Sequence, residues 1–175
     1  KNSSDLYSIR LKENISSNFN NYRDTILIID NNEKEVSSSV GHELMNEHPF
    51  SELRFSQAFE NISKLNLILK SGNLHEFCLL VESEALTLHS LMMSSDPSYL
   101  LMKAETLTVI EEIQKFRKLS NIPICFTLDA GANVHVLYPD KNSHEVSEFI
   151  KNNLSNYCAN GRFIDDIIGK GPKQN

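Results

Sequence analysis

The spacing of the hydrophobic residues changes twice along the chain, and the order of these changes limits the folds that the chain can adopt. A short β-branched run, residues 25–30, predicts a buried strand. Helical spacing follows and predicts a helix that begins near residues 37–39 and ends before Pro49, and longer helices over about 51–70, 74–93 and 103–119. Strands are then expected over 124–128, 134–138 and 163–168, with a helix over 143–157.

This order of elements is the split β-α-β plan of the ferredoxin-like fold, in the α+β class, with extra helices inserted in the first crossover. The plan implies an antiparallel sheet with helices on one face. Residues 1–24 are polar and rich in Ser and Asn, so we expect a partly irregular lead-in before a single domain over residues 25–172.

Composition and charge exclude several classes of function. The net charge of −6 and the pI of about 5.5 argue against a nucleic-acid-binding surface. No apolar run approaches the roughly 18 residues that span a membrane. The three cysteines, Cys78, Cys125 and Cys158, are far apart and form no C-x-x-C pair, which argues against a disulfide framework or a zinc cluster. We therefore expect buried thiols at Cys78 and Cys125, and a cytoplasmic protein.

The first candidate site is Asp129, which follows an apolar strand and opens the small-residue turn Asp129-Ala130-Gly131-Ala132-Asn133. Small residues allow the backbone to approach a ligand closely, and a carboxylate there could orient or deprotonate a hydroxyl group. The alternative is a turn aspartate that bonds only its own backbone.

The second candidate is the triple serine, Ser37, Ser38 and Ser39, at the expected start of a helix. Hydroxyl groups, free backbone N–H groups and the positive end of the helix dipole suit a phosphate or diphosphate. A simple N-cap within a polar loop would need the same residues.

A third group, Glu82, Glu84 and His89, lies on the helix predicted over 74–93. Glu82 and His89 are seven residues apart and share a face, where they either project into a cleft or form structural hydrogen bonds. Without further identifiable ligands, no metal site is predicted. Arg54 and Arg117 also lie on predicted helices and are expected to be solvated or ion-paired.

The sequence contains no glycine-rich loop of the kind that cradles phosphates, neither G-x-G-x-x-G nor G-x-x-x-x-G-K. We therefore expect that this chain cannot bind ATP unaided.

Taken in order, the motifs resemble those of mevalonate diphosphate decarboxylases of the GHMP kinase superfamily. The segment Lys34–Gly41, with its serines, resembles the diphosphate-contacting loop of that family. Glu84–His89, followed by Ser95-Asp96-Pro97, is similar to its long-helix signature. Phe126–Asn133 resembles its catalytic-aspartate turn, and Gly169–Pro172 its C-terminal end. The likeness covers about residues 20–172 and implies the ferredoxin-like fold of the GHMP kinase C-terminal domain.

The resemblance also implies an activity, which is the ATP-dependent conversion of mevalonate 5-diphosphate to isopentenyl diphosphate, CO2, ADP and phosphate. It places Asp129 beside the 3-hydroxyl group and Ser38 on the diphosphate. ATP and Mg²⁺ would be bound mainly by an N-terminal ATP-binding domain that is absent from this chain. That domain is an expected partner, a homodimer is expected for the full enzyme, and this chain alone is expected to be inactive.

This sequence departs from the family pattern at Ser39, where some relatives carry a diphosphate-contacting arginine. A different cation would then bind the diphosphate, or the site has been altered. Two other functions stay open. One is a GHMP kinase acting on mevalonate or a phosphorylated mevalonate, and the other is a non-catalytic ferredoxin-like binding module.

Overall fold

The computed structural model describes residues 15–32, 45 and 47–169, and all structural statements refer to these residues. The strands are β1 (Tyr22–Leu27), β2 (Cys125–Leu128), β3 (Val134–Pro139) and β4 (Phe163–Ile167). The α-helices are α2 (Ser51–Ser71), α3 (Leu74–Met93), α4 (Ala104–Ser120) and α5 (Ser143–Phe149). Short helical turns are η1 (Ser17–Phe19), η2 (Asp140–Asn142), the π-helical η3 (Ile150–Leu154), η4 (Ser155–Tyr157) and η5 (Ala159–Gly161).

The four strands form one sheet in the order β2-β3-β1-β4, and every neighbouring pair is antiparallel. Three long helices lie between β1 and β2 in the chain, and α5 lies between β3 and β4. The predicted α+β, ferredoxin-like architecture with extra helices in the first crossover is therefore confirmed.

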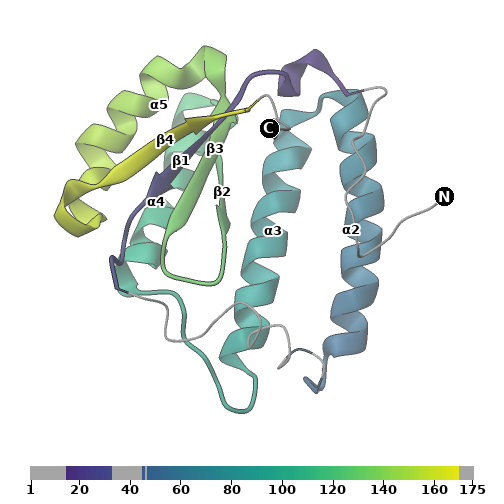
Figure 1. The fold of residues 1–175 in the computed structure, drawn as a ribbon. Coiled ribbons are helices and arrows are strands. Elements are labelled where there is room, and N and C mark those ends of the chain that lie inside the picture. Colours follow the sequence, from purple (N-terminus) through teal and green to yellow (C-terminus); the bar gives the residue numbers. More distant parts are fainter. Residues whose placement is uncertain (1–14, 33–44, 46, 170–175) are drawn as a thin grey trace, which may run out of the picture.

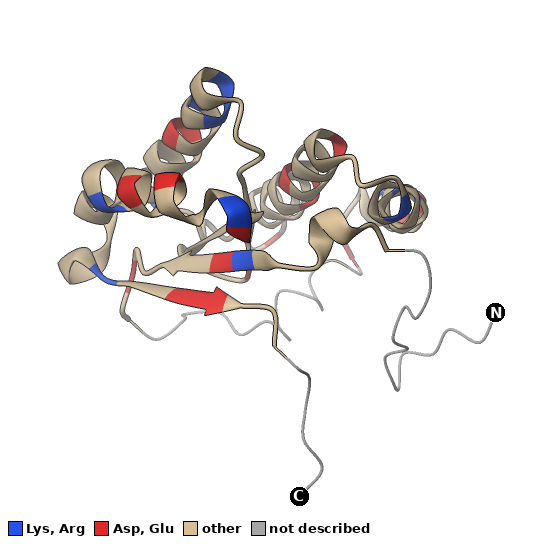
Figure 2. Cartoon of the chain, turned by 90° about the horizontal axis from the view of Figure 1, so that it is seen from above, with Lys and Arg blue, Asp and Glu red and all other residues tan. Residues whose placement is uncertain are grey.

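The helices gather on one side of the sheet. Seen from above in Figure 2, the helices lie on the same side of strands β1 and β4. Figure 1 shows α4 and α5 behind the sheet, α3 alongside strand β2, and α2 on the far side of α3. Contacts between α3 and β2, and between α2 and α3, agree with this arrangement. The opposite face of the sheet carries no described helix.

The main core lies between the sheet and helices α4 and α5. Alternate strand residues point to opposite faces, so Leu27 and its partner Val134 are fully buried, and Val136 lies beside them. The helices contribute a matching apolar set, which comprises Val109, Ile110, Ile113, Val146, Phe149, Ile150 and Leu154. Burial of these apolar surfaces is the dominant favourable contribution to folding.

Local signals account for the boundary between the two longest helices. Helix α2 ends at Gly72, which adopts the left-handed conformation with φ of 76°. Any side chain at this position would also collide with Ser16. Asn73 then caps α3, because its side-chain oxygen accepts a hydrogen bond from the backbone N–H of Glu76 at 3.2 Å.

Two boundaries differ from the sequence prediction. Strand β1 starts at Tyr22, three residues earlier than expected, and ends at Leu27. The polar Arg23 and Asp24 concealed this start. Both are accommodated because Arg23 pairs with Asp140 and Asp24 pairs with His135. The helix expected over 143–157 is α-helical only to Phe149 and continues in the turns η3 and η4.

A buried ion pair joins helices α3 and α4 to the sheet. The Arg117 guanidinium on α4 donates hydrogen bonds to both carboxylate oxygens of Glu82 on α3, at 2.5 and 2.8 Å. It also donates to the backbone oxygen of Ile124, directly before β2, at 2.8 Å. The Glu82 carboxylate raises the pKa of Arg117. The two charges satisfy each other in a site from which water is largely excluded.

The structure also bears on the cysteines and on membrane insertion. All three cysteines are free and buried, as expected for Cys78 and Cys125. Within the described part of the chain, every helix is too short or too polar to cross a membrane.

We predict that Arg117→Met destabilises the domain by about 3–5 kcal/mol, because it leaves the carboxylate of Glu82 buried without a partner. Urea-induced unfolding followed by circular dichroism measures the change. Lys118→Met, at the adjacent exposed position, is the matched control and should stay within about 0.5 kcal/mol of wild type. Equal stabilities for the two variants would contradict the assigned role of the ion pair.

Candidate active site

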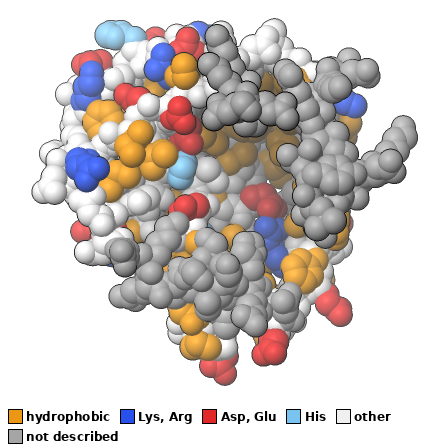
Figure 3. All heavy atoms as spheres, viewed as in Figure 1, with side chains coloured by type: hydrophobic (Ala, Val, Ile, Leu, Met, Phe, Trp, Pro, Cys, Tyr) orange, Lys and Arg blue, Asp and Glu red, His pale blue; other side chains and the backbone are white. Residues whose placement is uncertain are grey.

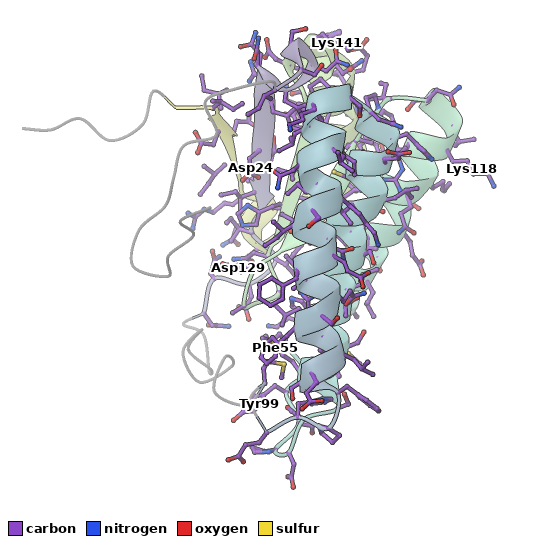
Figure 4. The ribbon with its side chains drawn as sticks, turned by 90° about the vertical axis from the view of Figure 1, so that its right-hand side faces the viewer. Asp24, Phe55, Tyr99, Lys118, Asp129 and Lys141 are labelled. Carbon is purple, nitrogen blue, oxygen red and sulfur yellow. The ribbon has the colours of Figure 1, made fainter. Side chains whose placement is uncertain are left out.

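The turn between β2 and β3 presents an acidic side chain at one end of the sheet. Asp129 follows the last residue of β2 and is exposed. Its backbone oxygen accepts a hydrogen bond from the N–H of Gly131 at 2.8 Å, which closes the turn. Figure 4 shows Asp129 and Asp24 on the same side of the molecule, away from Lys118 on α4.

Helix α3 holds the turn through His89. The Nε2 atom of His89 lies 3.0 Å from the backbone oxygen of Asp129. Because a carbonyl oxygen only accepts hydrogen bonds, Nε2 must carry the proton. The His89 side chain is only 2% exposed, and this burial lowers its pKa. The ring is therefore neutral near pH 7, with a defined tautomer.

Helix α4 holds the same turn from its first residues. The Thr106 hydroxyl is buried and donates to the backbone oxygen of Ala132 at 2.8 Å. It also accepts a hydrogen bond from the backbone N–H of Lys103 at 3.1 Å. A single hydroxyl thus caps the helix and supports the turn.

The segment after β1 provides a third support. The backbone N–H of Asp30 donates to the side-chain oxygen of Asn133 at 3.0 Å. The Asp30 carboxylate pairs with the Lys103 ammonium at 2.5 Å. The hydrogen bond from Lys103 lowers the pKa of Asp30. Three separate elements therefore fix the turn through Asp129, Ala132 and Asn133.

The three serines predicted to bind an anion, Ser37, Ser38 and Ser39, lie outside the described residues. The described residues on either side of them do have fixed positions. Asp30 contacts the turn as described above, and Met45 is buried against Leu91 and Met92 near the end of α3. Both flanks of the serine segment therefore lie at the Asp129 end of the domain.

The third candidate group is divided among separate structural contacts. Glu82 pairs with Arg117, while Glu84 accepts hydrogen bonds from Arg54 at 2.6 and 3.1 Å and from Asn61 at 2.6 Å. His89 contacts the turn instead. Both Arg54 and Arg117, which were expected to be either solvated or ion-paired, are ion-paired. Among the described residues, no cluster of three or more His, Cys, Asp or Glu side chains is arranged to hold a metal ion.

Sequence reasoning singled out His89 but did not identify the other residues that support the Asp129 turn. Thr106 and Lys103 were overlooked because capping residues are common at helix starts. Their spacing of three residues at the beginning of a helix was the available signal. The contact between Asp30 and Asn133 joins residues about 100 positions apart and left no local signal.

The sheet face without helices carries a second polar pair that the sequence did not indicate. The Nδ1 atom of His135 on β3 lies 2.9 Å from a carboxylate oxygen of Asp24 on β1. Figure 3 looks onto this side of the molecule, where acidic, basic and histidine side chains are visible among the described residues.

The chain is similar to known proteins in sequence and in fold. A family model described as the mevalonate 5-diphosphate decarboxylase C-terminal domain matches residues 25–170. A comparison with curated proteins found no match.

Several solved structures share the fold. Mevalonate pyrophosphate decarboxylase from Streptococcus pyogenes has a TM-score of 0.77 at 22% identity, over 87% of this chain and 46% of its own. The mevalonate diphosphate decarboxylase from Staphylococcus aureus has a TM-score of 0.77 at 22% sequence identity. The match covers 89% of this chain and 46% of that protein. A structure described as MDDEF in complex with MVAPP, AMPPCP and magnesium has a TM-score of 0.74 at 22% sequence identity. The match covers 89% of this chain and 49% of that protein. The chain therefore spans about half the length of these proteins.

The buried, neutral His89 should make the stability of the domain depend on pH. Its pKa in the folded state lies below the ordinary value of 6.5, so the unfolded chain binds the proton first as the pH falls. We expect the free energy of unfolding to decrease as the pH drops below about 6.5, and to decrease less in His89→Gln. Unfolding measured at pH 7, 6 and 5 tests this. The exposed His144→Gln is the control and should keep the wild-type profile. Parallel profiles for wild type and His89→Gln would contradict the assignment.

Proposed function

The chain belongs to the mevalonate 5-diphosphate decarboxylase C-terminal domain family, and on this premise we propose that it forms one half of an ATP-dependent decarboxylase. The full-length protein would convert mevalonate 5-diphosphate to isopentenyl diphosphate, CO2, ADP and phosphate. The observation that supports this proposal best is the exposed carboxylate of Asp129 on a turn fixed from three sides.

The proposed role of Asp129 is to orient, or accept the proton of, the 3-hydroxyl group of the substrate. A positioned carboxylate can remove a proton only if it lies within hydrogen-bond reach of the hydroxyl, so the precision of the turn matters. His89 and Thr106 anchor the backbone of the turn, Asp30 anchors the Asn133 side chain, and Asp129 itself is exposed. Phosphorylation of the oriented hydroxyl makes it a leaving group, and loss of phosphate and CO2 then forms the double bond of the product.

Ser38, with Ser37 and Ser39 beside it, is proposed to bind the diphosphate. The support is indirect. Asp30 and Met45, which flank the serine segment, lie at the Asp129 end of the domain. The serines lie between these two residues in the sequence, which is the basis for proposing that they bind the diphosphate of a substrate whose hydroxyl contacts Asp129.

ATP and Mg²⁺ do not fit the described residues as a complete site. These residues present an exposed carboxylate at the turn, but no cluster of acidic ligands. A magnesium ion bound with the nucleotide would need few protein ligands, so both would be held mainly by another part of the protein. We propose that this part is an N-terminal domain, since the chain spans about half the length of the structures that it resembles.

The remaining assignments extend this proposal. The full-length protein is proposed to be cytoplasmic, in agreement with three free thiols. A homodimer is proposed for the full-length enzyme. The 175-residue chain alone is expected to release no CO2 from mevalonate 5-diphosphate and ATP.

We predict that Asp129→Asn in the full-length protein lowers kcat by about 10²–10⁴-fold, because a positioned acid–base group contributes a factor of this order. The KM for mevalonate 5-diphosphate should change much less, since the diphosphate is held elsewhere. Steady-state measurement of CO2 release tests both values.

The control for Asp129→Asn is Glu111→Gln, which makes the same change from acid to amide at an exposed position on α4 and should leave both constants unchanged. If Asp129 only bonds its own backbone, Asn can replace it. A kcat within a few-fold of wild type would then exclude the catalytic role.

Ser38→Ala should show the opposite pattern, with a raised KM for mevalonate 5-diphosphate and a smaller change in kcat. A hydrogen bond to a charged group contributes about 1.5–3 kcal/mol, which corresponds to roughly 10- to 100-fold in affinity. Ser120→Ala, at the exposed far end of α4, is the matched control. An unchanged KM in Ser38→Ala would remove this serine from the substrate site.

A further inference from the structure

One face of helix α2 exposes three large apolar side chains in a row. Phe55 is 46% exposed, Phe59 is 74% exposed and Ile62 is 60% exposed. These residues are four and three positions apart, so on a helix of 3.6 residues per turn they lie within about 60° of one another. We call this group the α2 stripe.

The α2 stripe is not the surface by which α2 packs on the domain. The packing surface is marked by the buried Asn61 and Ile68, and by Arg54, which pairs with Glu84 on α3. Two further exposed leucines, Leu53 and Leu67, lie about 160° and 120° from Phe55 around the helix axis. They are 71% and 67% exposed and provide a natural comparison within the same helix.

The α2 stripe faces the Asp129 side of the molecule. In Figure 4, Phe55 lies on the side of α2 on which Asp129 and Asp24 also lie, whereas Lys118 is on the opposite side. This is also the side on which the sheet has no described helix cover (Figure 1). A body that covered the α2 stripe would therefore stand over the exposed end of the Asp129 turn.

We propose that the α2 stripe is the docking surface for the nucleotide-binding half of the full-length protein. Contiguous exposed apolar side chains of this kind mark interaction surfaces. The chain spans 46% of the Streptococcus pyogenes structure, so a body of about its own size remains to be placed. That body must reach Asp129 if it is to deliver a phosphoryl group, and the α2 stripe lies on the side from which it would approach. This inference rests on the proposed function for the identity of the occupant.

Hydroxyl-radical footprinting with mass spectrometry tests the proposal without an activity assay. The 175-residue chain and the full-length protein are labelled at equal, low concentration, and each residue is compared with itself. We expect oxidation of Phe55, Phe59 and Ile62 to be at least about fivefold lower in the full-length protein, while Leu53 and Leu67 stay equally reactive. Equal labelling of Phe59 in the two proteins would overturn the proposal.

A charge placed in the interface provides a second test in the full-length protein. Phe59→Glu should restore the labelling of Phe55 and Ile62 toward the level of the 175-residue chain, because a carboxylate is costly to bury there. Leu67→Glu, on the other side of the same helix, is the matched control and should leave their protection unchanged. Protection that survives Phe59→Glu, or is lost equally in both variants, would contradict the assigned surface.

The alternative occupant, a second copy of this chain, has its own signature. It would protect the α2 stripe in the 175-residue chain as the concentration rises, in parallel with a dimer mass in light scattering, and that result would refute the proposal. CO2 release by the wild-type full-length protein is measured separately. Protection of the α2 stripe without CO2 release would contradict the proposed decarboxylase activity but support the docking surface. CO2 release without protection would support the activity but contradict the docking surface.

Discussion

The guanidinium of Arg117 is the contact on which the geometry of the candidate site depends. It reaches from α4 to the Glu82 carboxylate on α3 and to the backbone oxygen of Ile124, directly before β2. Hydrogen bonds are directional, so this group sets the position of α3 along the edge of the sheet. Seven residues after Glu82, on the same face of α3, His89 meets the carbonyl oxygen of Asp129. The buried ion pair and the position of the turn are thus coupled through one rigid helix.

Polar contacts, rather than apolar packing, fix the position of the turn that carries Asp129. The core around Ile113 and Val134 drives folding, but hydrophobic burial is non-directional and tolerates small shifts. A buried donor without an acceptor costs about 1–3 kcal/mol, so displacing the turn from His89 or Thr106 is penalised at once. Two such supports from different helices hold the turn more tightly than the small residues Ala130 and Gly131 could alone.

The uneven distribution of helices gives the domain its two functional sides. Helices α4 and α5 cover one face of the sheet (Figure 2), while the half-buried pair of Asp24 and His135 lies on the other face. The Asp129 turn and the α2 stripe belong to this less covered side. This arrangement agrees with the proposed two-part enzyme, because the core is complete on one side while Asp129 lies on the less covered side.

The sequence by itself determined the order of the strands and long helices that the structure describes and the place of Asp129 between two strands, while the helix predicted to end before Pro49 lies largely outside the described residues. The spacing of apolar residues is a local property, so the sequence predicted the helix over 74–93 with the bounds that α3 has in the structure. Tertiary structure alone decided what surrounds Asp129. The contacts from His89 and Asp30 join residues far apart in the chain, and local patterns cannot specify such pairs. It also decided that Glu82 and Glu84 serve separate ion pairs, because only packing shows which cation each carboxylate meets.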